Sequence, residues 1–106
     1  MAGVSVVGSE PEWRSFLLNA EVVIVDFTAT WCGPCRAIGP VFENYATQYQ
    51  SITFLKVDVD DLSAVAEQFN ITVMPTFLVF VNGEKADELV GASKEKLLEL
   101  IQKYAR

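Results

Sequence analysis

Hydrophobic and polar positions divide the chain into short segments of strand and helix character. Three runs are almost continuously apolar, a pattern typical of strands covered on both faces of a sheet; they span residues 22–27, 52–59 and 76–81. Residues 4–7 predict a further short strand. Residues 85–90 predict a fifth, because they follow Asn82-Gly83, a strong hairpin signal.

Apolar residues at helical spacing predict four helices between and after these strands. The first begins at a capping box formed by Ser9 and Glu12. The second runs from the cysteine motif at residues 32–35 to about residue 49, and a short third helix follows the next strand. The last begins at Ser93. This order predicts an α/β architecture, with a mixed five-stranded central sheet and the four helices on both of its faces.

Length and composition indicate one globular domain over residues 1–106. Of the 106 residues, 51% are apolar and 21% are charged, and a chain of this length buries roughly 65% of its surface on folding. A core of that size needs neither disulfide staples nor a structural metal. No stretch reaches the ~20 apolar residues that a membrane span requires, and residues 1–7 lack the features of a secretory signal. We therefore expect a cytoplasmic protein.

The charge and the absence of histidine exclude several classes of function. The net charge is −6, which is unfavourable for binding the phosphate backbone of a nucleic acid. Without histidine, the chain has no imidazole for general acid–base catalysis, for a Ser-His or Cys-His nucleophile pair, or for metal ligation.

The candidate chemistry lies in Cys32-Gly33-Pro34-Cys35, at the junction of a strand and a helix. Unpaired N–H groups at a helix N-terminus favour the thiolate form of Cys32. The spacing of three residues brings the Cys35 sulfur within reach of a small disulfide ring. Gly33 leaves the approach to Cys32 open, and Pro34 stiffens the ring. Trp31 precedes the pair on a loop, and we expect its side chain to be an exposed contact surface, unlike that of Trp13.

Three other interpretations of the cysteine pair fit less well. A zinc site needs four ligands, and the chain offers two cysteines and no histidine, so no metal site is expected. A purely structural disulfide across so short a loop would constrain the unfolded chain little. Two inert core cysteines would not need this spacing at the start of a helix. A redox-active dithiol is therefore the preferred interpretation.

Asp26 and Lys56 each interrupt an apolar run that is expected to be a buried strand. Burial disfavours the charged form of a carboxyl group, so we expect the pKa of Asp26 to be raised. Two interpretations of Asp26 remain: a proton relay for the cysteine pair, which is favoured, or a salt-bridge partner of Lys56.

Two further motifs have more than one interpretation. Met74-Pro75 precedes a buried strand, and the proline either terminates the loop or forms a cis bond that exposes the backbone of Met74 to a peptide partner. Asp58, Asp60 and Asp61 have a spacing that suggests calcium, but the glycine and the distal glutamate of an EF-hand loop are missing. A solvated loop, with Asp60 or Asp61 capping the third helix, is expected instead.

The sequence resembles the thioredoxin family over nearly its whole length. The motifs that carry the resemblance keep the family's order and spacing: DFTATWCGPCR at residues 26–36, Pro40, KVDVD at 56–60, MPTF at 74–77, Gly83 and Gly91. Arg36 stands where many members have lysine, which keeps the positive charge.

The resemblance implies the thioredoxin fold and a protein-disulfide reductase without a bound cofactor. Cys32 would attack a substrate disulfide, and a buried Cys35 would resolve the mixed disulfide while Asp26 helps to remove its proton. Lys56, the positively charged residue considered as a partner of Asp26, is also predicted to be a catalytic residue.

The resemblance also implies a substrate surface and a set of partners. The Met74–Pro75 bond would be cis and lie against the cysteine pair. The shallow docking surface for disulfide-containing proteins would be lined by Trp31, Met74, Pro75 and Gly91. An NADPH-dependent thioredoxin reductase would recharge the protein, which is expected to be a monomer that binds neither nucleic acid nor membrane.

Related functions remain as alternatives. Gly-Pro between the cysteines disfavours a glutaredoxin, and the absence of histidine disfavours a protein disulfide isomerase domain. A metallochaperone, or an adaptor that uses the fold as a rigid subunit without catalysis, stays open at this point.

Overall fold

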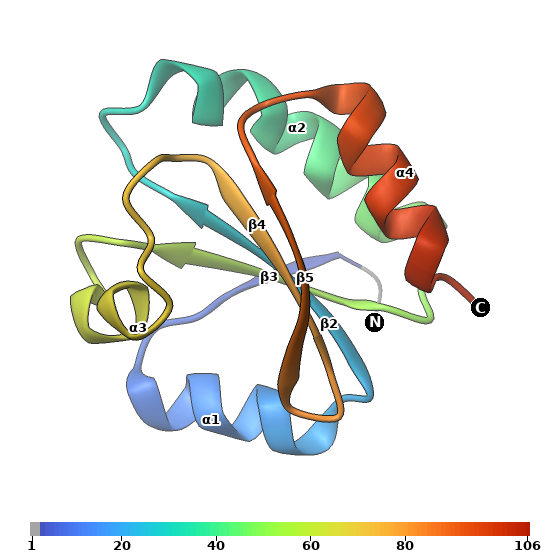
Figure 1. The fold of residues 1–106 in the computed structure, drawn as a ribbon, viewed down its shortest axis with the longest axis horizontal. Helices are drawn as coiled ribbons and strands as arrows, with labels where there is room; N and C mark the ends of the chain where they lie inside the picture. Colours follow the sequence, from blue (N-terminus) through green and yellow to red (C-terminus); the bar gives the residue numbers. More distant parts are fainter. Residues whose placement is uncertain (1–2) are drawn as a thin grey trace.

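In the computed structural model, which describes residues 3–106, strands and helices follow one another in the predicted order (Figure 1). None of the helices in this part of the chain is long and apolar enough to cross a membrane. The elements are β1 (Val4–Val6), α1 (Glu10–Asn19), β2 (Val22–Thr28), α2 (Gly33–Gln48), β3 (Thr53–Asp58), α3 (Ser63–Gln68), β4 (Thr76–Val81), β5 (Glu84–Val90) and α4 (Lys94–Tyr104).

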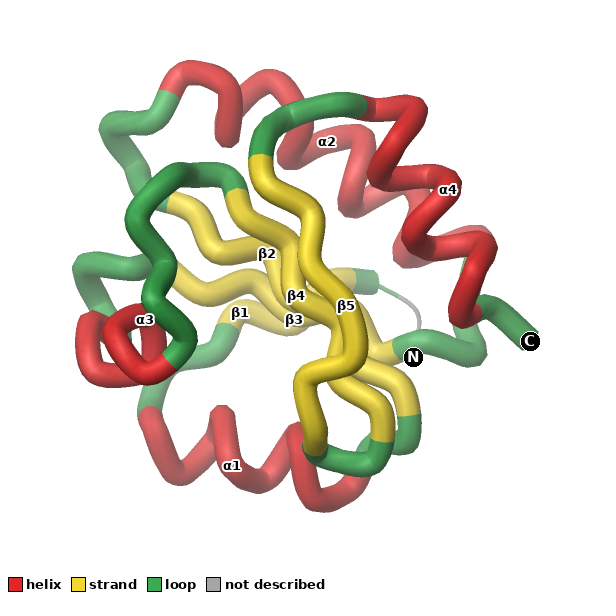
Figure 2. Tube along the Cα trace, viewed as in Figure 1, coloured by secondary structure: helices red, strands yellow, loops and turns green. Residues whose placement is uncertain are grey.

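The five strands form one mixed sheet in the order β1-β3-β2-β4-β5. β1, β3 and β2 are parallel, whereas β4 is antiparallel to both β2 and β5. Figure 2 shows α1 and α3 on one face of the sheet and α2 and α4 on the other. The predicted α/β architecture with helices on both faces is therefore confirmed.

Strand β2 lies at the centre of the sheet, and all seven of its residues are buried. Its side chains alternate between the two faces: Ile24 belongs to the core beneath α2 and α4, whereas Val25 and Phe27 belong to the core beneath α1 and α3. Burial on both faces explains why the strand reads as a continuous apolar run. By the same alternation, Asp26 points toward the face that α2 covers.

Aromatic side chains fill the two cores and fix the helices to the sheet. Beneath α2, the ring of Phe42 lies 5.2 Å from that of Phe54 and 5.5 Å from that of Phe77. On the other face, Trp13 of α1 packs edge-on against Phe80 at 5.4 Å. Because the packing of Phe42 holds α2 against the sheet, the start of α2 has a fixed position over the end of the sheet.

The start of α3 differs from the prediction. The residue before α3 is Leu62, and no side-chain hydrogen bond caps the helix. The Asp58 carboxylate instead accepts hydrogen bonds from the backbone N–H groups of Asp60, at 2.8 Å, and Asp61, at 3.4 Å. The prediction that Asp60 or Asp61 caps α3 is wrong, because the first aspartate of the cluster folds the loop as an Asx turn before the helix begins.

Candidate active site

Cys32 and Cys35 are joined by a disulfide at the N-terminus of α2. Their Cα atoms are 5.3 Å apart, because residues three apart lie on the same side of the first helical turn. Gly33 and Pro34 are exposed and form the first two positions of α2, where the missing N–H of proline removes no helical hydrogen bond. The predicted strand-to-helix junction is confirmed.

The Cys32 sulfur caps the helix that follows it. Its Sγ accepts a hydrogen bond from the backbone N–H of Cys35 at 3.2 Å, and the carbonyl of Cys32 accepts one from the N–H of Arg36 at 3.3 Å. A helix N-terminus stabilises negative charge at this position. Once the disulfide is reduced, this environment favours a thiolate at Cys32.

Exposure does not distinguish the two cysteines in the disulfide form, since Cys32 is 5% and Cys35 is 4% exposed. They differ in their surroundings. The Cys32 Sγ lies 3.5 Å from the carbonyl oxygen of Met74. Cys35 lines a pocket of about 380 Å³ together with Arg36 and Lys56. The Cys32 sulfur thus faces a backbone carbonyl, whereas Cys35 lines a pocket whose surface is mainly apolar but includes the charged residues Arg36 and Lys56.

Asp26 lies buried on β2, opposite Lys56 of β3. Its side chain is 1% exposed, and Oδ1 has no hydrogen-bond partner among the described residues. Burial raises the pKa of Asp26 from 3.8 to about 7, and the positive charge of Lys56 opposes part of that shift. No ion pair joins the two side chains within residues 3–106. The salt bridge considered from the sequence is therefore not formed.

The loop before β4 lies against the disulfide. The Met74–Pro75 bond is cis, as the resemblance implied, and Met74 packs against the cluster of Ala29, Cys32 and Cys35. The N–H of Gly91 donates to the Pro75 carbonyl at 2.9 Å. Gly91 has φ +103°, a conformation that glycine adopts without strain. Met74, Pro75 and Gly91 are thus brought together with the cysteine pair.

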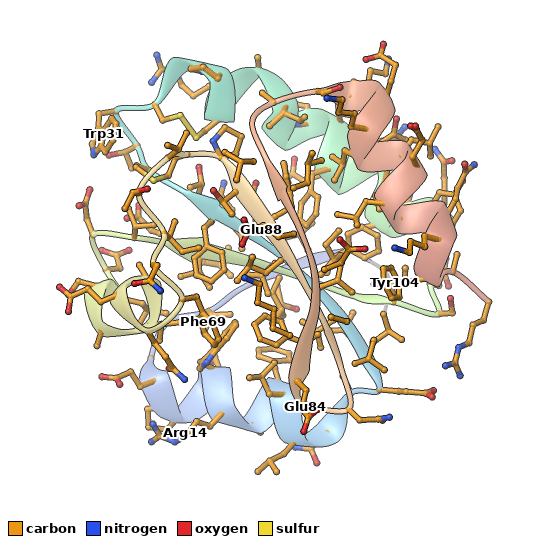
Figure 3. All side chains as sticks on the ribbon, in the orientation of Figure 1. Arg14, Trp31, Phe69, Glu84, Glu88 and Tyr104 are labelled. Carbon is orange, nitrogen blue, oxygen red and sulfur yellow. A yellow bond between two sulfur atoms is a disulfide. The ribbon has the colours of Figure 1, made fainter. Side chains whose placement is uncertain are left out.

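Trp31 is exposed beside the disulfide and is held in place by Asp60, a residue considered from the sequence only as a calcium ligand or a helix cap. The Trp31 side chain is 64% exposed, against 3% for Trp13, as predicted, and Figure 3 labels it at the loop before α2. The indole Nε1–H donates to the Asp60 carboxylate at 3.1 Å. Val73 and Val90 are also about half exposed, so an apolar rim accompanies Trp31, Met74 and Gly91.

Two acidic residues at the end of β3 and in the loop after it accept hydrogen bonds. Asp58 binds loop N–H groups, and Asp60 binds the Trp31 indole. Within residues 3–106, no group of three or more His, Cys, Asp or Glu side chains is placed to hold a metal ion. The carboxylates of Asp58 and Asp60 thus serve as hydrogen-bond acceptors in and beside this loop.

Comparisons with known proteins agree with this geometry. Residues 4–103 match the Thioredoxin family. Thioredoxin 1 of Plasmodium falciparum is 49% identical over 102 residues, which cover 96% of this chain and 98% of that protein. A thioredoxin H-type of Chlamydomonas reinhardtii is 50% identical over 107 residues, covering 96% and 95%.

Solved structures give the same result. The structure of Plasmodium falciparum thioredoxin has a TM-score of 0.94 at 48% identity and covers 95% of this chain and 99% of its own. That of Malassezia sympodialis thioredoxin has a TM-score of 0.94 at 41% identity, with 100% and 94% covered. Because the match includes the cysteine pair and almost all of the sheet and helices around it, this chain belongs to the thioredoxin family, as a protein-disulfide oxidoreductase that works by dithiol–disulfide exchange.

Proposed function

We propose that Cys32 is the attacking residue of this reductase and Cys35 the resolving one. In the reduced protein, the Cys32 thiolate attacks one sulfur of a substrate disulfide, and the other substrate sulfur leaves as a thiolate. The Cys35 thiolate then attacks the Cys32 sulfur, the substrate's second sulfur leaves, and the Cys32–Cys35 disulfide forms. Two electrons have passed to the substrate. The observation that supports these roles is the position of Cys32, whose sulfur accepts the N–H of Cys35 at the start of α2.

Asp26 serves as the proton acceptor for Cys35 in this proposal. A base is most effective when its pKa lies near the working pH, and burial raises the pKa of Asp26 to about 7. Because successive side chains alternate between the two faces of β2, that of Asp26 points toward α2, the helix that carries Cys35. Lys56, opposite Asp26 and in the same pocket as Cys35, acts as the charge that keeps this pKa from rising further.

Substrate proteins dock on the surface formed by Trp31, Met74, Pro75 and Gly91. Met74 is half-buried and Pro75 is buried beside it, with the Met74 carbonyl oxygen 3.5 Å from the Cys32 sulfur. Trp31 contributes a large apolar contact area. The exposed Val73 and Val90, next to Met74 and Gly91 in the chain, add apolar area to this surface. A substrate segment that is extended on either side of its cysteine would fit this docking surface.

The remaining parts of the cycle are also proposals. An NADPH-dependent thioredoxin reductase returns electrons to the Cys32–Cys35 disulfide. No bound cofactor is needed, since the disulfide itself carries two electrons. We place this single domain of residues 1–106 in the cytoplasm and expect it to act as a monomer.

Reduction of insulin, followed by the precipitation of its free B chain, tests the proposed roles. With dithiothreitol as the electron source, wild type should accelerate precipitation, and Cys32→Ser and Cys35→Ser should not. Thr47→Ser is a matched control, because it makes a similarly small change near the other end of α2. Oxidation of NADPH by a purified thioredoxin reductase, dependent on the wild-type protein, tests the proposed recharging. Turnover by Cys32→Ser would contradict the assignment of Cys32.

A further inference from the structure

Three consecutive carbonyl groups in the loop before β4 each have a defined neighbour. The Val73 carbonyl accepts a hydrogen bond from the Thr76 hydroxyl. The Pro75 carbonyl accepts one from the N–H of Gly91 at 2.9 Å. The Met74 carbonyl, between them, has its oxygen 3.5 Å from the Cys32 sulfur. The outer two carbonyls are thus anchored by donors, and the middle one faces the redox centre.

Thr76 is a rigid anchor for this loop. Its side chain is 3% exposed. Its backbone is fixed on both sides, because Thr76 lies opposite Phe27 of β2 and opposite Val90 of β5. A hydroxyl on so constrained a residue restrains the Val73 carbonyl that it binds, and with it the direction of the next peptide group.

The Met74 carbonyl oxygen stabilises the protonated form of Cys32 in the reduced protein. At this separation, the thiol can donate a weak hydrogen bond to the carbonyl oxygen, which stabilises the protonated form. The partial negative charge of the oxygen also disfavours a thiolate at the same place. The carbonyl therefore acts against the helix N-terminus, which favours the thiolate.

We propose that Thr76 is a positioning residue for the disulfide exchange: by holding the Val73 carbonyl, its hydroxyl keeps the Met74 carbonyl against the Cys32 sulfur and restrains the formation of the thiolate. This inference rests on Cys32 being the attacking residue, as proposed above. It assigns to Thr76 a tuning role that is separate from its contribution to the start of β4.

The test is the pH profile of Cys32 alkylation by iodoacetamide in the reduced protein, with mass spectrometry identifying the modified cysteine. Four proteins are compared: wild type, Thr76→Val, Thr76→Ser and Tyr104→Phe. Thr76→Val is nearly isosteric and lacks the hydroxyl, whereas Thr76→Ser keeps it. Tyr104→Phe is the matched control, because it removes one hydroxyl hydrogen bond, to Asp87, at the far end of α4.

Thr76→Val should lower the pH midpoint of Cys32 alkylation by roughly half a unit, which is about threefold more thiolate below the midpoint and the size expected for one lost hydrogen bond to the neutral thiol. Thr76→Ser and Tyr104→Phe should keep the wild-type midpoint. Thr76→Ala also lacks the hydroxyl and is smaller than valine. It should lower the midpoint in the same way if the valine side chain disturbs the packing.

A lower stability in urea with an unchanged midpoint would overturn the proposal, because Thr76 would then be only structural. A midpoint that moves upward, toward that of an ordinary thiol, would also overturn it, because general loosening of the site has that effect. Alkylation of Cys35 in place of Cys32 in wild type would overturn the assignment of the attacking thiol itself. That outcome is recognised in wild type alone, independently of the Thr76 variants.

Discussion

Asp26 and Lys56 lie opposite each other on the neighbouring parallel strands β2 and β3, yet in the described part of the chain no ion pair joins them. The carboxylate is buried and leaves Oδ1 without a hydrogen-bond donor within residues 3–106. An acid in that environment is destabilised when charged and binds a proton readily. The same burial that suits Asp26 to its proposed role as a base for Cys35 therefore lowers the stability of the fold.

Asp26→Asn should be more stable than wild type above pH 7. The folded pKa of about 7 exceeds the ordinary value of 3.8, so between these values the folded protein holds more protons than the unfolded chain. Wild-type stability therefore falls as the pH rises through this window. The shift corresponds to roughly 4 kcal/mol, and a buried amide without partners offsets roughly 1–3 kcal/mol of it. A gain of roughly 2 kcal/mol in urea unfolding near pH 8 is expected.

This gain should shrink as the pH falls below 7, and well below pH 3.8, where the wild-type carboxyl is neutral in both states, only the cost of the unpartnered amide should remain. Insulin reduction by Asp26→Asn should be slower than by wild type at pH 7, since Cys35 has lost its proton acceptor. Asp61→Asn changes an exposed acid in the pocket that Cys35 lines, and it should change neither property. A variant as fast as wild type, or no more stable, would show that Asp26 is not the base.

Lys56→Met should raise the pKa of Asp26 above its wild-type value. The Lys56 charge opposes the effect of burial, and methionine retains much of the aliphatic side chain while removing that charge. The measurement is a titration of the Asp26 carboxyl carbon by NMR. Lys94→Met, at the exposed start of α4, is the control and should leave the titration unchanged. An unchanged Asp26 titration in Lys56→Met would mean that the two side chains are electrostatically independent.

Most of the fold was predictable because its signals are local. The run at residues 22–27 indicated a doubly covered strand, and the residues that interrupt the apolar runs, Asp26 and Lys56, indicated a buried polar pair. Whether those two side chains form an ion pair was not predictable. The outcome depends on the register of β3 against β2 and on how deeply α2 buries the Asp26 carboxyl group. Asp26 does lie opposite Lys56, but no ion pair joins them in the part of the chain that the structure describes.

Contacts between distant loops were also beyond the sequence. Nothing in the sequence indicated that the Trp31 indole would bond to Asp60, because that contact depends on how the loop after β3 folds around Asp58. In the same way, Thr76 looked like an ordinary strand residue. Its proposed role rests on a hydrogen bond to Val73, which no periodicity of the sequence indicates.

Asp60→Ala should weaken substrate docking with little change in stability. The Trp31–Asp60 hydrogen bond is exposed, so its loss should lower the free energy of unfolding by at most about 1 kcal/mol. Without it, the Trp31 side chain must be ordered when substrate binds, and the KM for insulin should rise roughly threefold with little change in kcat. Asp61→Ala removes the neighbouring acid and leaves the Trp31 contact in place. Equal KM values for the two variants would contradict the positioning of Trp31 by Asp60.

The most direct test of the exchange mechanism is to trap its intermediate. Cys35→Ser, incubated with an oxidised protein substrate, cannot complete the second exchange, so a mixed disulfide should accumulate. Mass spectrometry of the intact adduct and of its peptides should place the bond at Cys32, and Cys32→Ser should form no such adduct. An adduct through Cys35 in Cys32→Ser, with none in Cys35→Ser, would show that the roles of the two cysteines are reversed.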